Sequence, residues 1–106
     1  MMDFKWSAAE KKIARRAYDR ALDRECAAVL VELRRRVAAA DPRNDLWSIH
    51  DYLTERREDV DRKYDYRYSQ LVMVFGTLLR QGWLDERDIV GLAEDKLQAI
   101  RMVASL

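Results

Sequence analysis

The chain has 106 residues, with 20 Lys and Arg side chains against 19 Asp and Glu side chains and a net charge of +1. This length bounds it to one domain or one subunit of an oligomer, and the balanced charge gives no overall basic field for nucleic acid. Hydrophobic residues, at 49%, are too many for a disordered chain. Three Gly and one Pro are too few for a small β-sandwich or barrel, so the composition favours long helices.

Several classes of protein are excluded or disfavoured in the same way. No apolar run is long enough to span a membrane. The stretch Met1–Trp6 lacks an apolar signal core, which predicts a cytoplasmic protein. One His and one Cys do not build an ordinary zinc site, so we expect no metal and no cofactor. Neither a Gly-rich phosphate loop nor a nucleophile motif is present, and we therefore expect a protein that is not an enzyme.

The first predicted helix covers residues 8–40. Ser7 and Glu10 have the spacing of a capping box at its start, and no Gly or Pro interrupts it before Pro42. Apolar residues recur every three or four positions, which predicts one buried face. That face would include Ala14, Tyr18, Leu22, Cys26, Val29, Leu33, Val37 and Ala40. On this pattern Cys26 is a buried structural thiol rather than a nucleophile.

The second predicted helix covers residues 45–81, with Asn44 or Asp45 as its cap and Gly82 at its C-terminal end. The spacing between residues along one side of this helix, here called its seam, alternates between three and four positions, as in a heptad pattern. The seam contains Leu46, Ile49, Leu53, Arg57, Val60, Tyr64, Arg67, Leu71, Val74 and Leu78.

Residues 85–104 predict a C-terminal head of one helix or of two, because Gly91 can kink or split it. The predicted fold is therefore all-α, a single helical domain over residues 1–106 with two long helices and a small head. Two such helices overhang so small a head and leave apolar seams uncovered, which predicts an elongated homodimer.

One constellation indicates a binding surface. Trp47, His50, Asp51 and Arg57 fall within roughly 120° of one helix face. A large aromatic ring, a titratable ring, a carboxylate and a guanidinium together are typical of a specific protein–protein patch. The alternative is that Trp47 belongs to the core and the others are ordinary surface charges.

At these residues the chain resembles the fluorescence recovery protein family. The shared pattern comprises Trp47, His50-Asp51 and Arg57, then residues 63–69, the apolar run to Phe75, and Leu78, Leu79, Gly82 and Leu84. The resemblance implies a dimeric, all-helical, non-enzymatic regulator. Such a regulator binds the photoactivated orange carotenoid protein, speeds its return to the resting form and ends quenching of the phycobilisome antenna. It also implies that Trp47, His50, Asp51 and Arg57 lie in the dimer interface or contact the partner, and that the head takes part in binding.

Two alternatives stay open. Arginine outnumbers lysine 15 to 5, a bias typical of GC-rich bacteria, so a family-like dimer could bind a different protein partner in a non-photosynthetic bacterium. Residues 1–40 carry ten basic and six acidic side chains, a net +4, which could serve a nucleic-acid-binding dimer. Nucleic acid is disfavoured, because Asp19, Asp23 and Glu25 interleave with the arginines and predict local ion pairs on a solvated face.

Overall fold

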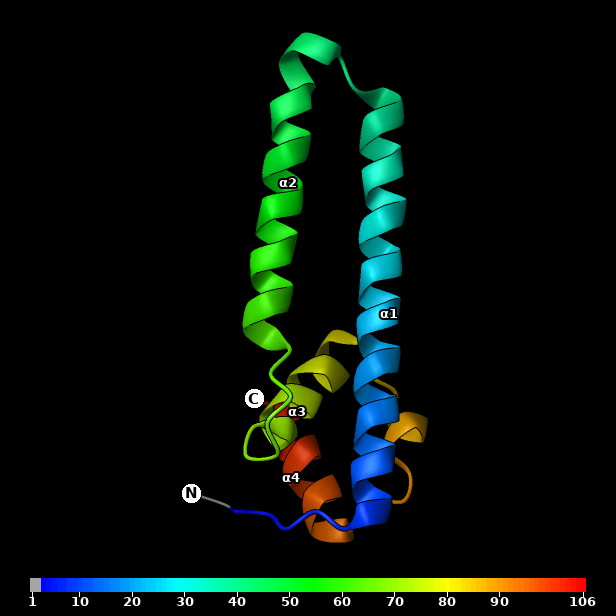
Figure 1. Cartoon of the computed structure of the whole chain (residues 1–106), viewed down its shortest axis with the longest axis vertical. Coiled ribbons are helices and arrows are strands. Elements are labelled where there is room, and N and C mark those ends of the chain that lie inside the picture. The colour runs from blue at the N-terminus through cyan, green and yellow to red at the C-terminus, as the bar shows by residue number, and fades with distance from the viewer. Residues whose placement is uncertain (1–2) are drawn as a thin grey trace.

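The computed structural model describes residues 3–106, and within that range every regular element is helical. The elements are α1 (Ala8–Ala39), α2 (Pro42–Lys63), α3 (Leu71–Gln81), the short 3-10 helix η1 (Glu86–Ile89) and α4 (Glu94–Ala104). Figure 1 shows α1 and α2 side by side as an antiparallel hairpin, with α3, η1 and α4 gathered at the base of α1. The radius of gyration is 16.6 Å, against about 13 Å for a compact 100-residue domain. The all-α class is confirmed, and the chain is elongated.

Helix α1 begins where its capping residues place it. The Ser7 hydroxyl accepts a hydrogen bond from the Glu10 backbone N–H at 3.1 Å, and the Glu10 carboxylate accepts one from the Ser7 N–H at 3.0 Å. The apolar side chains that α1 buries are small, because α3 and η1 pack directly against it. They are Ala14, Ala17 and Ala21, and the carboxylates of Glu10 and Glu25 are buried on the same helix.

The predicted seam of this helix is partly wrong. Cys26 is exposed, so it is not the buried structural thiol that the pattern indicated. The burial follows the alanines at positions 14, 17 and 21 and ends at Glu25. The thiol lies beyond that point, in the part of α1 that faces only α2. The expectation of a cytoplasmic protein rested on a stretch that begins with Met1 and Met2, which lie outside the described residues.

The second predicted helix, over residues 45–81, is corrected at both its start and its middle. It begins at Pro42 rather than after Asn44, because Pro is favoured in the first turn and the Asp41 carboxylate caps the Asn44 N–H at 2.9 Å. It ends at Lys63, and the chain runs through a non-helical elbow (residues 64–70) before α3 starts.

The elbow contains no Gly or Pro, so local propensity does not explain the break. Burial explains it, since the elbow lets α3 turn into the head, where Leu71, Phe75 and Leu78 pack in the core with residues of α1 and α4. With the break, all three are fully buried. Tertiary packing of these side chains therefore overrides the continuous helical pattern.

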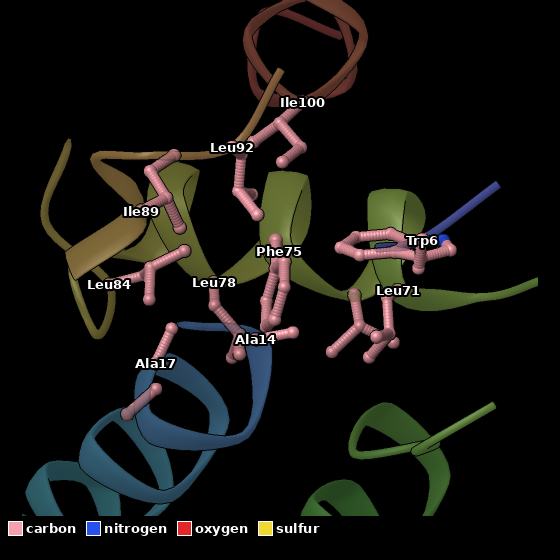
Figure 2. Packing of buried hydrophobic residues seen from close by; sticks show 12 residues of the cluster. Trp6, Ala14, Ala17, Leu71, Phe75, Leu78, Leu84, Ile89, Leu92 and Ile100 are labelled. Carbon is pink, nitrogen blue, oxygen red and sulfur yellow. The ribbon is translucent and has the colours of Figure 1, made fainter. Parts of the chain in front are cut away.

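The head, which comprises α3, η1, α4 and the first half of α1, holds the hydrophobic core. Figure 2 shows Phe75 of α3 at its centre, between Ala14 of α1 and Leu92, with Trp6 beside Leu71. Helices α3 and α4 approach closely at Gly76. A β-carbon there would lie 2.4 Å from both the Cβ and the Cγ1 of Val103, so only glycine fits.

Gly91 divides the C-terminal segment into η1 and α4. Its φ of 103° lies in the left-handed region, which favours glycine. Asp85 caps η1 through its carboxylate, which accepts a hydrogen bond from the Arg87 backbone N–H. Ala93, the N-cap of α4, has no polar side chain that could cap the helix, and its backbone N–H donates a hydrogen bond to the Glu10 carboxylate of α1 at 2.9 Å.

Glu10 thus joins three parts of the head, because the buried Lys96 ammonium also lies 3.0 Å from its carboxylate. Burial alone raises the pKa of Glu10. Hydrogen bonds from the Ala93 and Ser7 backbone and from Lys96 outweigh that effect and lower the pKa from 4.5 to about 2.

Because this pKa is depressed in the folded state, the stabilisation is complete above pH 4.5 and is lost as the pH falls towards 2. We expect the free energy of unfolding of the wild type to fall by up to about 3 kcal/mol more than that of Glu10→Gln across this range. Denaturant unfolding at a series of pH values measures the difference. Parallel pH profiles for the two proteins would show that Glu10 has no such role.

The Gly76 contact gives a second stability prediction. Gly76→Ala inserts a methyl group into Val103, and we expect it to lower the free energy of unfolding by about 1–3 kcal/mol. The double variant Gly76→Ala/Val103→Ala removes the obstructing atoms and should recover part of that loss relative to the sum of the single variants. Additive losses would contradict the contact.

Candidate functional site

Helix α2 carries the four predicted site residues on its outer face. Trp47 is 70% exposed, and the side chains of His50 and Asp51 are 70% and 74% exposed. Arg57 is more open still, with its side chain 84% exposed. The half-buried residues Ile49, Tyr52, Arg56 and Val60 lie on the opposite side, towards α1. The structure therefore brings the four residues together on one helix face, and Trp47 is not part of a core within this chain.

Their contacts within the chain are few and local. The His50 Nδ1 lies 3.5 Å from the Asp51 carboxylate, and the Arg57 Nε lies 3.7 Å from the carboxylate of Asp61 one turn later. Exposed pairs of this kind contribute little to stability. The donors and acceptors of the site are therefore available to a partner.

A shallow apolar groove runs between α1 and α2 beside this face, with a volume of about 260 Å³. Cys26 and Val29 of α1 form one wall, and Leu53, Arg56, Arg57 and Val60 of α2 form the other. Farther along the hairpin, the Arg36 guanidinium lies 4.0 Å from the centroid of the Tyr52 ring. Arg57 therefore borders both the outer face of α2 and the groove.

The hairpin formed by residues 26–63, here called the stem, has no buried residue at all. Most of the large exposed apolar side chains lie on it. These are Leu30, Val31, Val37, Leu46, Trp47 and Leu53. A surface of this kind, built on two long helices with no core of its own, is typical of an interface that another chain covers.

The orientation of the stem depends on Glu25, which the sequence pattern did not identify. Its buried carboxylate accepts hydrogen bonds from the Lys63 ammonium at 2.7 Å and from the Tyr64 hydroxyl at 2.9 Å. The Tyr18 hydroxyl donates to the Tyr64 carbonyl at 3.0 Å, and Lys63 also donates to the side chain of Gln81 at 2.8 Å. Burial, and then the hydrogen bond to Glu25, raise the pKa of Tyr64. The available sequence signal was that Glu25 continues the stripe of Ala14, Ala17 and Ala21 by one turn.

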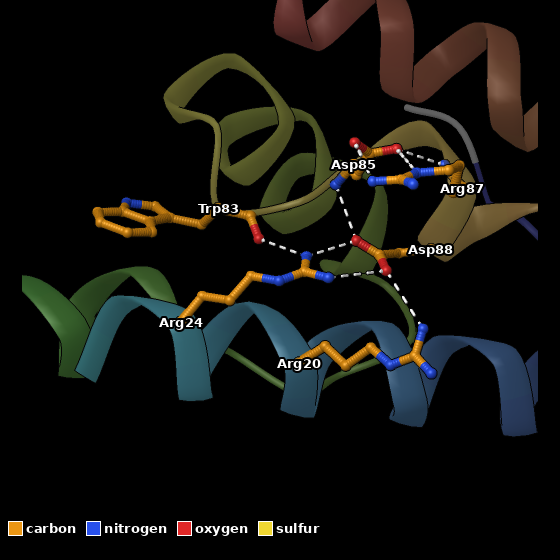
Figure 3. A network of polar contacts seen from close by, with 6 residues as sticks. All are labelled: Arg20, Arg24, Trp83, Asp85, Arg87 and Asp88. Carbon is orange, nitrogen blue, oxygen red and sulfur yellow. Dashed lines mark hydrogen bonds and ion pairs between the residues drawn. The ribbon is translucent and has the colours of Figure 1, made fainter. Parts of the chain in front are cut away.

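A second polar cluster holds η1 against α1, as Figure 3 shows. The Arg24 guanidinium makes two hydrogen bonds to the Asp88 carboxylate, at 2.6 and 3.2 Å, and a third to the Trp83 carbonyl at 3.0 Å. Arg20 approaches the same carboxylate at 3.5 Å. Burial raises the pKa of Asp88, but the bonds from Arg24, the Asp85 backbone and Arg20 more than compensate and lower it. The cluster supports the arrangement of the head rather than a reaction.

The head carries a second, larger groove of about 720 Å³, which the sequence pattern also missed. Met73 of α3 and Met102 of α4 lie on it with 52% and 66% of their surface exposed. The sequence does contain a signal for this groove in the helical periodicity of α3. The buried side of α3 comprises Leu71, Val74, Phe75 and Leu78, and Met73 is an apolar residue that points away from that side.

Three other kinds of site were considered for the described part of the chain: a metal site, a membrane-spanning helix and a basic surface. Within residues 3–106, no three His, Cys, Asp or Glu side chains gather in an arrangement that could hold a metal ion. The helices of the same range are each too short or too polar to cross a lipid bilayer. On the basic side of α1, a shallow surface of lysines and arginines is interrupted by Asp19 and Asp23, and Arg15 pairs with Asp19 at 3.7 Å.

Comparison with known proteins supports the resemblance noted in the sequence. The profile of a family described as the photoprotection regulator fluorescence recovery protein matches residues 6–104. The fluorescence recovery protein of Synechocystis sp. (strain ATCC 27184 / PCC 6803 / Kazusa) is 34% identical over 101 residues, which cover 95% of this chain and 93% of that protein.

Solved structures agree with the sequence match. The fluorescence recovery protein of Fremyella diplosiphon superposes with a TM-score of 0.91 at 37% identity, and the match covers 96% of this chain and 100% of that one. The Synechocystis sp. PCC 6803 structure gives the same TM-score at 33% identity, with the same coverage. Both the fold and the sequence therefore match over nearly the whole chain.

Proposed function

The chain belongs to the fluorescence recovery protein family of photoprotection regulators, and we propose that it acts without catalysing a reaction, by binding the photoactivated orange carotenoid protein. In doing so it speeds the return of that protein to its resting form and ends quenching of the phycobilisome antenna. The observation that carries the proposal is the outer face of α2. Trp47, His50, Asp51 and Arg57 are assembled and exposed there, and the ion pairs that they make lie on the same helix, between His50 and Asp51 and between Arg57 and Asp61.

The proposed active form is an elongated homodimer built through the stem. No residue of the stem is buried within one chain, and six large apolar side chains are exposed along it. A two-fold contact between two stems would bury these side chains with the same residues from each copy. The four site residues would then lie within that interface or at its edge, where a partner could contact residues of both copies.

Acceleration of relaxation requires differential binding. A regulator speeds a conformational change only if it binds the relaxing transition more tightly than the active state. A stem of two long helices that contacts the partner along its length suits this role, because it favours one geometry of the partner over another. A guanidinium such as that of Arg57 suits it as well, since its bidentate hydrogen bonds depend strongly on the direction of the acceptor.

The arginine-rich composition favours a second candidate, a dimer of the same architecture that binds a different protein in a non-photosynthetic bacterium. Affinity capture from the native host with wild-type protein, alongside Arg57→Leu as a matched bait, separates the two. A carotenoid-binding protein retained by the wild type alone supports the first candidate. Another protein retained with the same dependence on Arg57 supports the second.

The dimer proposal predicts a strong effect of Trp47→Ala. We expect the dissociation constant of the dimer to rise about 30-fold, because a large aromatic side chain that becomes buried in an interface contributes about 2 kcal/mol or more. Size-exclusion chromatography with light scattering over a dilution series measures it. Val90→Ala, at an exposed apolar position of the head, is the control and should leave the dimer unchanged. A wild-type chain that is monomeric at low micromolar concentration would contradict the proposal.

The binding proposal predicts that Arg57→Leu slows relaxation. We expect the acceleration of the photoactivated orange carotenoid protein to fall about tenfold or more, because a hydrogen-bonded guanidinium is lost from the contact. Absorbance of the carotenoid after illumination follows the relaxation. Arg87→Leu removes the same charge from an exposed residue of η1 and should retain wild-type rates. Equal rates for Arg57→Leu and the wild type would remove Arg57 from the site.

A further inference from the structure

The N-terminal segment before α1 forms one wall of the head groove. This strap, residues 3–6, leaves the start of α1 and runs towards α4 at the base of the molecule, as Figure 1 shows. Asp3 and Phe4 line the groove from the strap, and Val72 and Met73 line it from α3. The groove is therefore completed by a segment that belongs to no helix.

Trp6 anchors the strap. This residue is 9% exposed, and its indole packs in the core beside Leu71 and Phe75 (Figure 2). The Lys96 ammonium lies 5.3 Å from the Trp6 ring centroid and 5.9 Å from that of Phe4, so one buried cation attracts both rings. Glu10 holds that ammonium in place. Phe4 is consequently held in position by its contacts with the core.

The groove is lined mainly by apolar side chains, together with the polar side chains of Tyr68, Ser69 and Gln70 and the carboxylate of Asp3. Among the lining residues that the structure describes, Asp3 has the only charged side chain, and no lysine or arginine lines the groove. Methionines such as Met73 and Met102 adapt to apolar side chains of varied shape, and a groove of this volume has room for several of them. The surface thus fits an apolar segment that carries a positive charge.

We propose that the strap gives the head groove its selectivity, with Phe4 packing against an apolar segment of the partner protein and Asp3 favouring a basic side chain beside that segment. Trp6 acts as the positioning residue for both. The inference rests on the proposed function only in taking the partner to be a protein. It assigns a role to residues outside the stem and outside the constellation of Trp47, His50, Asp51 and Arg57.

The first test needs no natural partner. Two short capped peptides of leucines, one with a single lysine and one with a single glutamate, are titrated into protein labelled at the methionine methyl groups. We expect both peptides to shift the Met73 and Met102 signals and the lysine peptide to bind about two- to fivefold more tightly at low salt, as a partly exposed ion pair allows. Asp3→Asn should abolish that preference, and Asp3→Lys should reverse it.

Two further variants separate the charge preference at Asp3 from apolar contact in the groove and from acidic side chains elsewhere. Phe4→Ala should weaken both peptides by about threefold to tenfold without altering their ratio, because it removes apolar contact and no charge. Asp23→Asn removes an acidic side chain of α1 outside the groove and should keep the wild-type preference. Equal binding of the two peptides to the wild type, a preference that survives in Asp3→Asn, or methionine signals that neither peptide moves would each overturn the inference.

Binding of the photoactivated orange carotenoid protein to the same variants distinguishes this inference from the proposed function. If the wild type does not bind that protein but keeps the charge preference for peptides, the proposed function fails and the role of the strap stands. If it binds that protein and the peptide preference is absent, the strap has no selective role and the proposed function stands.

Discussion

The carboxylate of Glu25 is the contact on which the arrangement of this chain depends. It lies buried at the point where α1 leaves the head, and it receives both the Lys63 ammonium and the Tyr64 hydroxyl. These bonds hold the end of α2 against α1, so the chain can turn through the elbow and return α3 to the core. A buried carboxylate without these partners would be strongly destabilising, which makes the three groups interdependent.

This arrangement divides the molecule into two parts with different sources of stability. The head has a conventional core centred on Phe75 and fastened by the Glu10–Lys96 and Arg24–Asp88 pairs. The stem has helical hydrogen bonds and exposed apolar side chains but no buried residue. Most of the stability of long helices in proteins comes from packing of an apolar face, so the proposed second copy would supply what the stem lacks.

Local signals in the sequence were sufficient where local chemistry decides the structure. Ser7 and Glu10 marked the start of α1, and Gly82 and Gly91 marked turns whose φ values lie in the left-handed region. The same reasoning failed at residues 64–70, where the helical pattern continues unbroken. The break results from burial of α3 against α1, and periodicity within one segment contains no information about that distant contact. Cys26 was misplaced for the same reason, because its stripe passes beyond the end of the head.

The candidate site was accessible from the sequence because its residues share one face of one helix, whereas both grooves are formed by segments distant in the chain. The absence of buried residues in the stem has a consequence for divergence within the family. Substitutions there change little of what holds a single chain together, whereas the head and Glu25 tolerate few changes. A contact surface on the stem could therefore be remodelled for a new partner without loss of the scaffold that the head and Glu25 hold together.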